Sequence, residues 1–346
     1  KRRLARIQFP TLMDEALKIV DAIKSGDIKP LYLLMGEEPY YVDKVSEYIE
    51  EHVLSEDERG FNQTVLYGRD VNVPDLVGAA KRYPMMADRQ VIIVKEAQAI
   101  TGKLDKLEEY VANCTPTTVL VLCYKGKDVD KRKALYKNFQ KHGVVLESKK
   151  FKDAQVQTWI AKLLKSKGLQ IEPKAVAMIN DNLGNNLSRI ATEIDKLVVN
   201  IPSGSTVTAA DVELYVGISK DFNIFELRKA IAQKNTTKAF QIVDYFTKSK
   251  NDMPLVVIVA QLHKFFSQLL ILHGLKDKSK PAAAQALGVS PYFVDEFFDG
   301  IRVYPMKKVS SMIAALRDID LQSKGVGAAN AKESDLFKLL LIKIFA

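Results

Sequence analysis

Cysteine and histidine are scarce in this chain. It has only Cys114 and Cys123, and four scattered histidines, among 346 residues. The two cysteines have neither the spacing of a metal-binding pair nor that of a disulfide framework, which is typical of a protein from a reducing compartment. No H-x-x-x-H spacing and no Cys/His cluster occurs in the sequence. We therefore expect no metal site, no disulfide-stabilised fold and a cytoplasmic location.

Long apolar runs and targeting signals are also missing. We find no run long enough to cross a bilayer and no secretory signal pattern at the start, so the sequence predicts no contact with a membrane. Apolar residues make up 47% of the chain and charged residues 27%, which is ordinary for a globular protein. The length is sufficient for two or three domains with buried cores.

Acidic residues are fewer than basic residues. The chain has 42 Asp and Glu against 51 Lys and Arg, which leaves a net charge of +9. Such an excess permits attraction to the phosphates of nucleic acids. We interpret the positive charge as spread along the chain rather than gathered in one stripe, and so expect weak DNA binding by the isolated chain. A basic DNA-binding protein is one alternative, which strong and salt-sensitive binding to duplex DNA would indicate.

A phosphate-binding loop is missing where one would fit. A short buried strand is predicted to run into a turn at Gly36, and residues 40–50 are predicted to form a helix. A P-loop in this setting needs G-x-x-x-x-G-K-[ST], so that backbone N–H groups, a lysine and a hydroxyl meet the phosphates. The chain instead continues with Glu37, Glu38 and Pro39. These residues bring two carboxylates and a proline without an N–H to the place where an anion would bind, and no second glycine follows.

A second departure affects the metal-binding half of such a site. A nucleotide hydrolase of this class needs a carboxylate at the end of a neighbouring strand to hold Mg²⁺. The predicted strand at 118–124 is followed by Lys125, Gly126 and Lys127. We therefore expect a degenerate nucleotide site, no cofactor and no ATPase activity. A divergent nucleotide hydrolase that uses other residues is the enzyme alternative, and specific ATP binding would indicate it.

The first part of the chain alternates helix and strand patterns. The strands are predicted from short runs rich in Val, Ile, Leu, Thr and Tyr, at residues 31–34, 63–67, 90–94, 118–124 and 144–146. Near-continuous apolar strands are typical of a parallel sheet that is covered on both faces. The sequence therefore predicts an α/β domain over residues 1–149.

After Lys150 the strand signals fade and helical periodicity takes over. The predicted helices lie at residues 153–165, 173–183, 186–199, 225–232, 236–249, 254–275, 306–321 and 336–345. A turn cluster follows Pro202, and the lysine-rich stretch 276–281 is predicted to be an exposed loop. The second part of the chain is therefore expected to be helical.

A pair of methionines occupies a short connector in the first part. Asn72 and Pro74 predict the start of a helix, and Pro84 predicts that this helix has ended by about Arg82. Because a strand begins soon afterwards, Met85 and Met86 are confined to the connector. Two flexible thioether side chains are suited to an apolar pocket on another protein. The alternative is that both side chains fold back under the edge of the sheet.

Several strings along the chain together resemble the delta subunit of bacterial DNA polymerase III. They occur in the same order as in that family and extend over essentially the whole chain: GEEPYYVDK, PMMADRQVIIVKE, GNNLSRIATEIDKL, DFNIFELRKAI, LGVSPYFVDEF and LRDIDLQSKG. Each string is a weak signal by itself, whereas the ordered combination is fairly specific.

The resemblance implies a fold and a set of partners. It implies an AAA+-like first domain without ATPase activity at 1–149, a helical lid domain at 150–217 and a helical collar domain at 218–346. It also implies membership of a clamp loader, beside delta-prime and the gamma or tau subunits. In that family the first domain binds the beta sliding clamp and helps to open the ring, so that the ring can be placed on primed DNA.

The resemblance also implies which residues contact the clamp. The family uses an apolar pair just before A-x-R-Q, and here the pair corresponds to Met85 and Met86, flanked by Pro84 and Ala87. Family members often carry Leu or Phe there, so the two methionines keep the apolar bulk and lose the rigid aromatic shape. In the last domain, Tyr292 is a candidate for stacking on a DNA base. The alternative for Tyr292 is packing within the collar.

Overall fold

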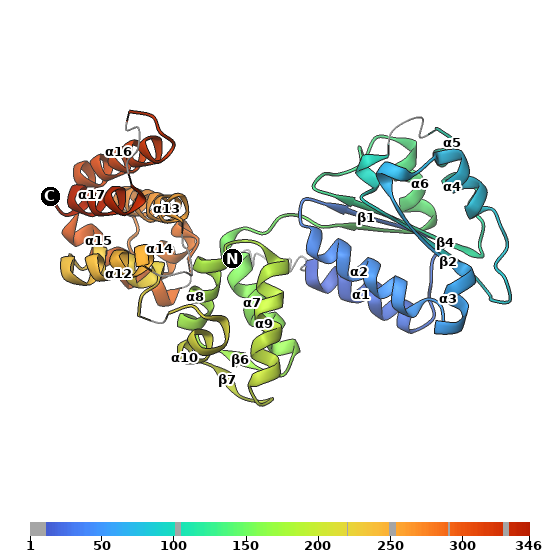
Figure 1. Ribbon diagram of the computed structural model, residues 1–346, viewed down its shortest axis with the longest axis horizontal. Helices are drawn as coiled ribbons and strands as arrows, with labels where there is room; N and C mark the ends of the chain where they lie inside the picture. Colours follow the sequence, from blue (N-terminus) through green and yellow to red (C-terminus); the bar gives the residue numbers. More distant parts are fainter. Residues whose placement is uncertain (1–11, 101–104, 220, 249–253, 290, 328–331) are drawn as a thin grey trace, which may run out of the picture. The chain divides into compact units, whose positions relative to one another are not determined.

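The computed structural model describes residues 12–100, 105–219, 221–248, 254–289, 291–327 and 332–346. The chain divides into two compact units, Lys1–Phe151 and Lys152–Ala346. The first unit is built around a sheet, and the second is mainly helical (Figure 1).

A five-stranded parallel sheet forms the centre of the first unit, with the strand order β2-β3-β4-β1-β5. Its strands are β1 (Leu31–Gly36), β2 (Gln63–Tyr67), β3 (Gln90–Lys95), β4 (Thr118–Lys125) and β5 (Val144–Glu147). Each of the five predicted strands is confirmed to within two residues. Residues of β1 are all buried, because β1 lies inside the sheet and helices cover both faces.

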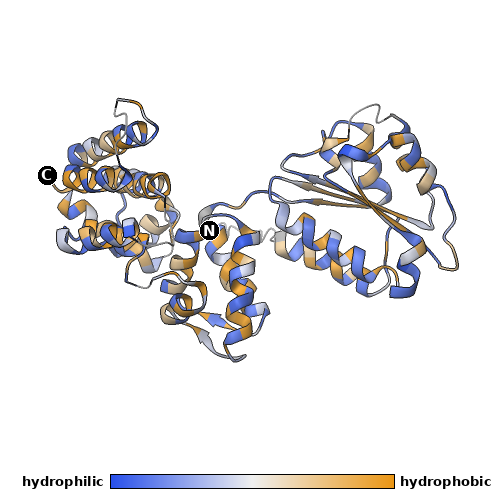
Figure 2. Ribbon diagram, in the orientation of Figure 1, coloured by the Kyte–Doolittle hydropathy of each residue, from blue (hydrophilic) through white to orange (hydrophobic). Residues whose placement is uncertain are grey.

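Helices α1 and α2 lie on one face of this sheet and α4, α5 and α6 on the other (Figure 1). The helices of the unit are α1 (Leu12–Lys24), α2 (Pro39–His52), α3 (Glu56–Asn62), α4 (Val73–Ala80), α5 (Asp105–Ala112) and α6 (Ala134–His142), with 3₁₀ turns η1 (Gly68–Asp70) and η2 (Ala97–Ala99). Alternate residues of β1, such as Leu31 and Leu33, join the core beneath α4–α6. The orange strands in Figure 2 show the same apolar centre.

The second unit begins with a helical group that carries a small sheet. Its elements are α7 (Asp153–Ser166), β6 (Gln170–Ile171), α8 (Pro173–Leu183), α9 (Leu187–Asn200), β7 (Thr206–Val207), α10 (Ala209–Asp211) and a π-helix, η3 (Val212–Val216). The two parallel strands β6 and β7 are a difference from the sequence expectation of helices alone. Each strand has two residues, which is too short to produce a detectable alternation of apolar side chains.

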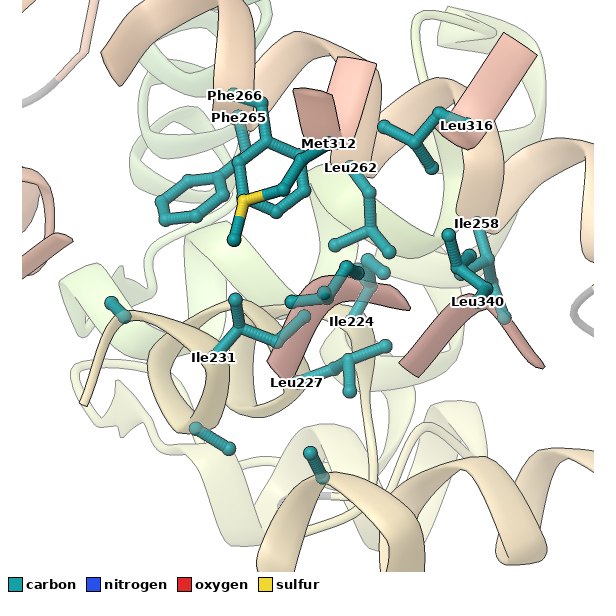
Figure 3. Close-up of a cluster of buried hydrophobic side chains, with 14 of the residues drawn as sticks. Ile224, Leu227, Ile231, Ile258, Leu262, Phe265, Phe266, Met312, Leu316 and Leu340 are labelled. Atoms are coloured by element: carbon teal, nitrogen blue, oxygen red, sulfur yellow. The ribbon is translucent and has the colours of Figure 1, made fainter. Parts of the chain in front are cut away.

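Seven further helices follow in the residues of the second unit that the structure describes. They are α11 (Ile224–Ala232), α12 (Thr236–Lys248), α13 (Leu255–Gly274), α14 (Lys280–Leu287), α15 (Val294–Val303), α16 (Met306–Ser323) and α17 (Glu333–Phe345), with a 3₁₀ turn, η4 (Pro291–Phe293). Figure 3 shows part of their shared core, in which Phe265 and Phe266 of α13 lie near Met312 of α16. The expected loop at 276–281 is only partly a loop, because α14 begins at Lys280 with Pro281 in its first turn.

The helix α13 contradicts the expectation that no apolar run could cross a membrane. Among the described residues it is the one helix whose length and composition would allow a membrane span, and half of its most apolar window is buried inside the protein. Its side chains at Leu262, Phe265 and Phe266 are buried in the core of the second unit. A helix at the centre of a bundle is apolar around most of its circumference, so this packing accounts for the composition.

Ion pairs join α8 to α11 and α11 to α15 within the second unit. The guanidinium of Arg228 lies 3.0 Å from Asp181 and 3.4 Å from Glu296, and all three side chains are largely buried. On the same side of α8, Lys174 lies 2.8 Å from Glu226. Buried charges of this kind are stable only when they are paired, so these contacts fix how α8 sits on the helices that follow.

Candidate protein-interaction site

The turn after β1 is closed by the chain itself. Gly36 has a φ of +138°, and a Cβ atom at this position would lie 2.0 Å from the carbonyl oxygen of Ser148. The N–H of Glu38 donates to that oxygen at 3.0 Å, and the Ser148 hydroxyl donates to the Glu38 carbonyl at 2.6 Å. The glycine is therefore required for close packing against the residue that follows β5, and the turn does not form an open loop around a ligand.

The carboxylate of Glu38 occupies the N-terminus of α2. Its Oε1 accepts a hydrogen bond from the N–H of Tyr40 at 3.0 Å, and Pro39 takes the first helical position, where it offers no N–H. The side chain is buried, and this burial raises the pKa of Glu38 above its usual value. A helix N-terminus attracts anions, and here the anion is a side chain of the same chain. Glu37, by contrast, is exposed.

Lys125 holds the place where a metal-binding carboxylate would be needed. It is the last residue of β4, and its Nζ lies 2.6 Å from Asp43 of α2 and 3.3 Å from Glu96. Burial by itself would lower the pKa of Lys125, but the two carboxylates outweigh that effect and raise the pKa. The carboxylates of Asp43 and Glu96 are therefore engaged with a lysine. Across the part of the chain that the structure describes, no three His, Cys, Asp or Glu side chains are grouped as metal ligands.

The connector between α4 and β3 (residues 81–89) has a fixed base. The side-chain amide of Gln90 donates to the carbonyl oxygens of Ala79 and Arg82 at 3.1 and 2.7 Å. The hydroxyls of Thr118 and Tyr110 donate to the carbonyl of Ala80 at 2.8 and 3.2 Å. These bonds satisfy carbonyl groups that the end of a helix leaves without partners, and they tie the connector to the sheet.

The tip of the connector is exposed. Met85 is 62% exposed and Met86 is fully exposed at 102%, so the alternative that both fold back under the sheet edge is wrong. Tyr83 is also exposed, whereas Pro84 and Ala87 are half-buried. Tyr83, Met85 and Met86 are thus exposed apolar side chains within one short connector, and a contiguous apolar surface of this kind is available to a partner.

The sequence reasoning missed Asn62, which contacts the connector from the end of α3. Its Oδ1 accepts from the N–H of Met85 at 2.6 Å, and its Nδ2 donates to the Met85 carbonyl at 2.9 Å. Asn62 is buried, although the preceding residue, Phe61, is 77% exposed. An isolated asparagine at the end of a seven-residue helix carries no sequence signal of such a contact.

Tyr292 is 62% exposed, so the alternative that it packs within the helical core is wrong for most of its ring. It lies in η4, and its ring makes an edge contact with Phe293, with centroids 5.0 Å apart. Phe293 belongs to a small buried cluster with Ala177 and Phe225. The backbone of Tyr292 is thus anchored, while the ring faces outward.

The positive charge is less evenly spread than the sequence suggested. Residues 125–150 hold nine basic and three acidic residues, an excess of six in a chain whose net charge is +9. Two parts of this basic segment follow β4 and β5, the strands on either side of β1. Because parallel strands end at one edge of a sheet, the exposed Lys127, Lys149 and Lys150 lie at the same edge as the Gly36 turn.

Comparison with known proteins gives consistent matches over the chain. The family described as DNA polymerase III, delta subunit matches residues 32–149, and the C-terminal domain of the same subunit matches residues 221–344. DNA polymerase III subunit delta of Bacillus subtilis (strain 168) is 27% identical over 333 residues, which is 93% of this chain and 95% of the relative. The probable DNA polymerase III subunit delta of Aquifex aeolicus (strain VF5) is 21% identical over 310 residues, or 85% of this chain and 86% of the relative.

A solved structure extends this similarity to the fold. The Bacillus subtilis DNA clamp loader delta protein superimposes with a TM-score of 0.59 at 25% sequence identity, covering 95% of this chain and 99% of that chain. The parallel sheet, the helical second unit and the ordered sequence matches agree with one another, and the chain belongs to the delta subunit family of DNA polymerase III.

Proposed function

We propose that this chain is a non-catalytic subunit of a clamp loader that binds the beta sliding clamp and helps to open it for loading on primed DNA. In this proposal Pro84, Met85, Met86 and Ala87 form the clamp-binding tip. The chain works in the cytoplasm beside delta-prime and gamma or tau subunits, and its second unit comprises a lid (150–217) and a collar (218–346). The exposed methionine pair on its fixed connector is the observation that carries the proposal.

The tip would act through binding energy rather than through bond chemistry. A ligand shifts a ring between closed and open forms only by its difference in affinity for the two forms. Changing the ratio of open to closed rings from 1:99 to 99:1 requires that the ligand bind the open form more tightly by about 5.5 kcal/mol. Burying one methionine side chain is worth about 1.5–3 kcal/mol, so the pair supplies part of the requirement. The rest must come from a wider surface and from other loader subunits.

The geometry of the degenerate nucleotide site supports the non-catalytic part of the proposal. Ser148 closes the turn at Gly36, Glu38 occupies the N-terminus of α2, and Lys125 engages Asp43 and Glu96. A divergent nucleotide hydrolase would need a binding place outside this region. Equilibrium titration with ATP and Mg²⁺ separates the two functions, since specific binding would favour the hydrolase.

The methionine tip is tested by replacing both Met85 and Met86 with alanine in the full-length chain. Calorimetric titration with the beta sliding clamp should show a loss of affinity of at least about 100-fold, because two apolar side chains leave the partner's pocket. Met306→Ala is the matched control, since Met306 is a half-exposed methionine at the start of α16. Unchanged clamp affinity of the double variant, with an unaltered melting temperature, would remove the assignment of this tip.

Contact with DNA is a second candidate function, which the basic segment favours. Phosphate contacts by lysine attract nucleic acids without regard to sequence. We propose that the exposed lysines at the edge of the sheet and the outward ring of Tyr292 contact primed DNA within the assembled complex. Strong duplex binding by the isolated chain, with no affinity for a clamp, would instead favour a basic DNA-binding protein.

A further inference from the structure

We propose that Asn62 is a positioning residue for the clamp-binding tip, an inference that rests on the proposed function. Its side-chain amide would hold the backbone of Met85 in the conformation that presents the two methionine side chains to the partner. Asn62 lies on α3, outside the connector itself, and its side chain bonds the backbone of Met85 in the tip.

The hydrogen bonds of Asn62 are complementary to one residue of the connector. Its Oδ1 accepts from the Met85 N–H at 2.6 Å, and its Nδ2 donates to the Met85 carbonyl at 2.9 Å. The same Nδ2 also donates to the carbonyl of Glu58 at 3.1 Å. Asn62 is 4% exposed, so these bonds are shielded from competing water. A side-chain amide has separate donor and acceptor atoms, so it can bond the N–H and the C=O of one residue together, whereas an ionised carboxylate only accepts.

The helix that carries Asn62 is itself anchored. Ser55 and Glu58 form a capping box at its start, with the Ser55 N–H and hydroxyl donating to Glu58 at 2.9 and 2.7 Å. Arg59 donates to the carbonyl of Leu54 at 3.3 Å and also to that of Glu51. A short helix is marginal by itself, but these contacts give α3 the rigidity that a positioning residue requires.

The connector needs such a support because its conformation is unfavourable by itself. Met86 has a φ of +52°, in the left-handed region that residues other than glycine adopt rarely. Strain of this kind costs on the order of 1–3 kcal/mol and persists only where the surroundings determine the backbone. Two bonds to the preceding residue hold the tip in this shape before a partner arrives, and a binding surface held in advance loses less entropy on binding.

The proposal is tested with Asn62→Ala in the full-length chain, by titration with the beta sliding clamp. We expect affinity to fall about 10-fold, the equivalent of about 1.4 kcal/mol. Asn223→Ala is the matched control, because Asn223 is also buried and its side chain likewise donates to one backbone group and accepts from another, in the second unit. Asn223→Ala should lower the free energy of unfolding by an amount similar to that of Asn62→Ala. Its affinity for the clamp should stay within twofold of the wild-type value. If Asn62→Ala does not fold, Asn62→Asp, which keeps the acceptor, replaces it.

A double-variant cycle separates positioning from a general structural role. If Asn62 acts through the tip, Asn62→Ala should cost less than twofold in affinity when Met85 and Met86 are both already alanine, because the side chains that it positions are gone. Equal losses in both backgrounds would overturn the proposal. Hydrogen exchange gives a readout independent of the clamp: the Met85 amide should exchange at least 10-fold faster in Asn62→Ala, and unchanged exchange would also overturn the proposal.

The double methionine variant and Asn62→Ala together distinguish an error about Asn62 from an error about the clamp-binding tip. If the double methionine variant loses clamp affinity and Asn62→Ala keeps it, only the positioning role is wrong. If the double methionine variant keeps its affinity, the clamp-binding tip is wrong and the role of Asn62 toward the clamp is wrong with it.

Discussion

Glu38 replaces a bound anion with a carboxylate of the chain itself. The side chain accepts from the N–H of Tyr40, at the end of α2 where the helix dipole favours negative charge. The sequence predicts that Glu37 and Glu38 both bring a carboxylate to the place where a phosphate would bind. The structure separates them, because Glu38 is buried and caps the helix whereas Glu37 is exposed. Residue type alone could not tell which carboxylate turns inward.

This difference predicts the effects of two neighbouring substitutions. Glu38→Ala should lower the free energy of unfolding by about 1 kcal/mol, the usual loss for a helix N-cap. Glu37→Ala should change it by less than about 0.5 kcal/mol, because the side chain is exposed. Denaturant unfolding followed by circular dichroism measures both. Glu38→Ala should also bind no ATP, since Ser148 still closes the turn; ATP binding by this variant would contradict our account of the site.

Among the elements, the five strands of the first sheet were predictable, whereas the short strands β6 and β7 and several helices were not. Each strand of the first sheet is a compact apolar run bounded by turn residues, and such runs are visible without any tertiary context. Helices α14 and α15 were missed, because Lys280 and its neighbours suggested a solvated loop and no helix was predicted between residues 281 and 306. The exposure of Met85 and Met86 could be stated only as one of two possibilities, since burial on a connector depends on partners such as Asn62 that lie far away in the sequence.

The packing of α8 and α15 on α11 predicts a dependence of stability on pH. Burial raises the pKa of Glu296 to about 7, although Arg228 opposes this shift and the carboxylates of Asp181 and Glu226 add to it. Between its usual pKa and about 7, the folded chain therefore holds a proton that the unfolded chain has released. Linkage then requires the free energy of unfolding to fall as pH rises through this window, by at most about 1.4 kcal/mol per pH unit.

Glu296→Gln removes this titration and is the control for it. Relative to the wild type, the glutamine variant should gain stability as pH increases from 5 to 7, and the difference should level off above the pKa of Glu296. Thermal unfolding of both proteins in parallel over this range measures the effect. A stability difference that does not change with pH would contradict the buried, proton-holding state of Glu296.

At the scale of the whole molecule, net charge was a poor guide to where charge is concentrated. The two ends of the basic segment, after β4 and after β5, lie at one edge of the first sheet. Replacing Lys127, Lys149 and Lys150 together with alanine should weaken binding to primed duplex DNA. It should also reduce the slope of log K against log salt by about 2.7 if each lysine contacts one phosphate. Fluorescence anisotropy over a salt series measures this slope, in the loader complex if the isolated chain binds too weakly.

A control variant tests whether position matters beyond total charge. Lys162, Lys229 and Lys307 are exposed lysines of the second unit, so their replacement removes the same charge from another part of the chain. For this variant, the slope of log K against log salt should be closer to that of the wild type. Equal slopes for the two triple variants would indicate that the basic segment has no particular role in DNA contact.

We propose that this chain acts on a ring-shaped partner by binding it, without using a nucleotide of its own. Ring opening measures this most directly, with a donor and an acceptor fluorophore placed on either side of one interface of the beta sliding clamp. In the absence of ATP, the wild-type chain should raise the fraction of open rings, and the variant with Met85 and Met86 both replaced by alanine should not. No opening by the wild-type chain, or equal opening by both proteins, would contradict the account.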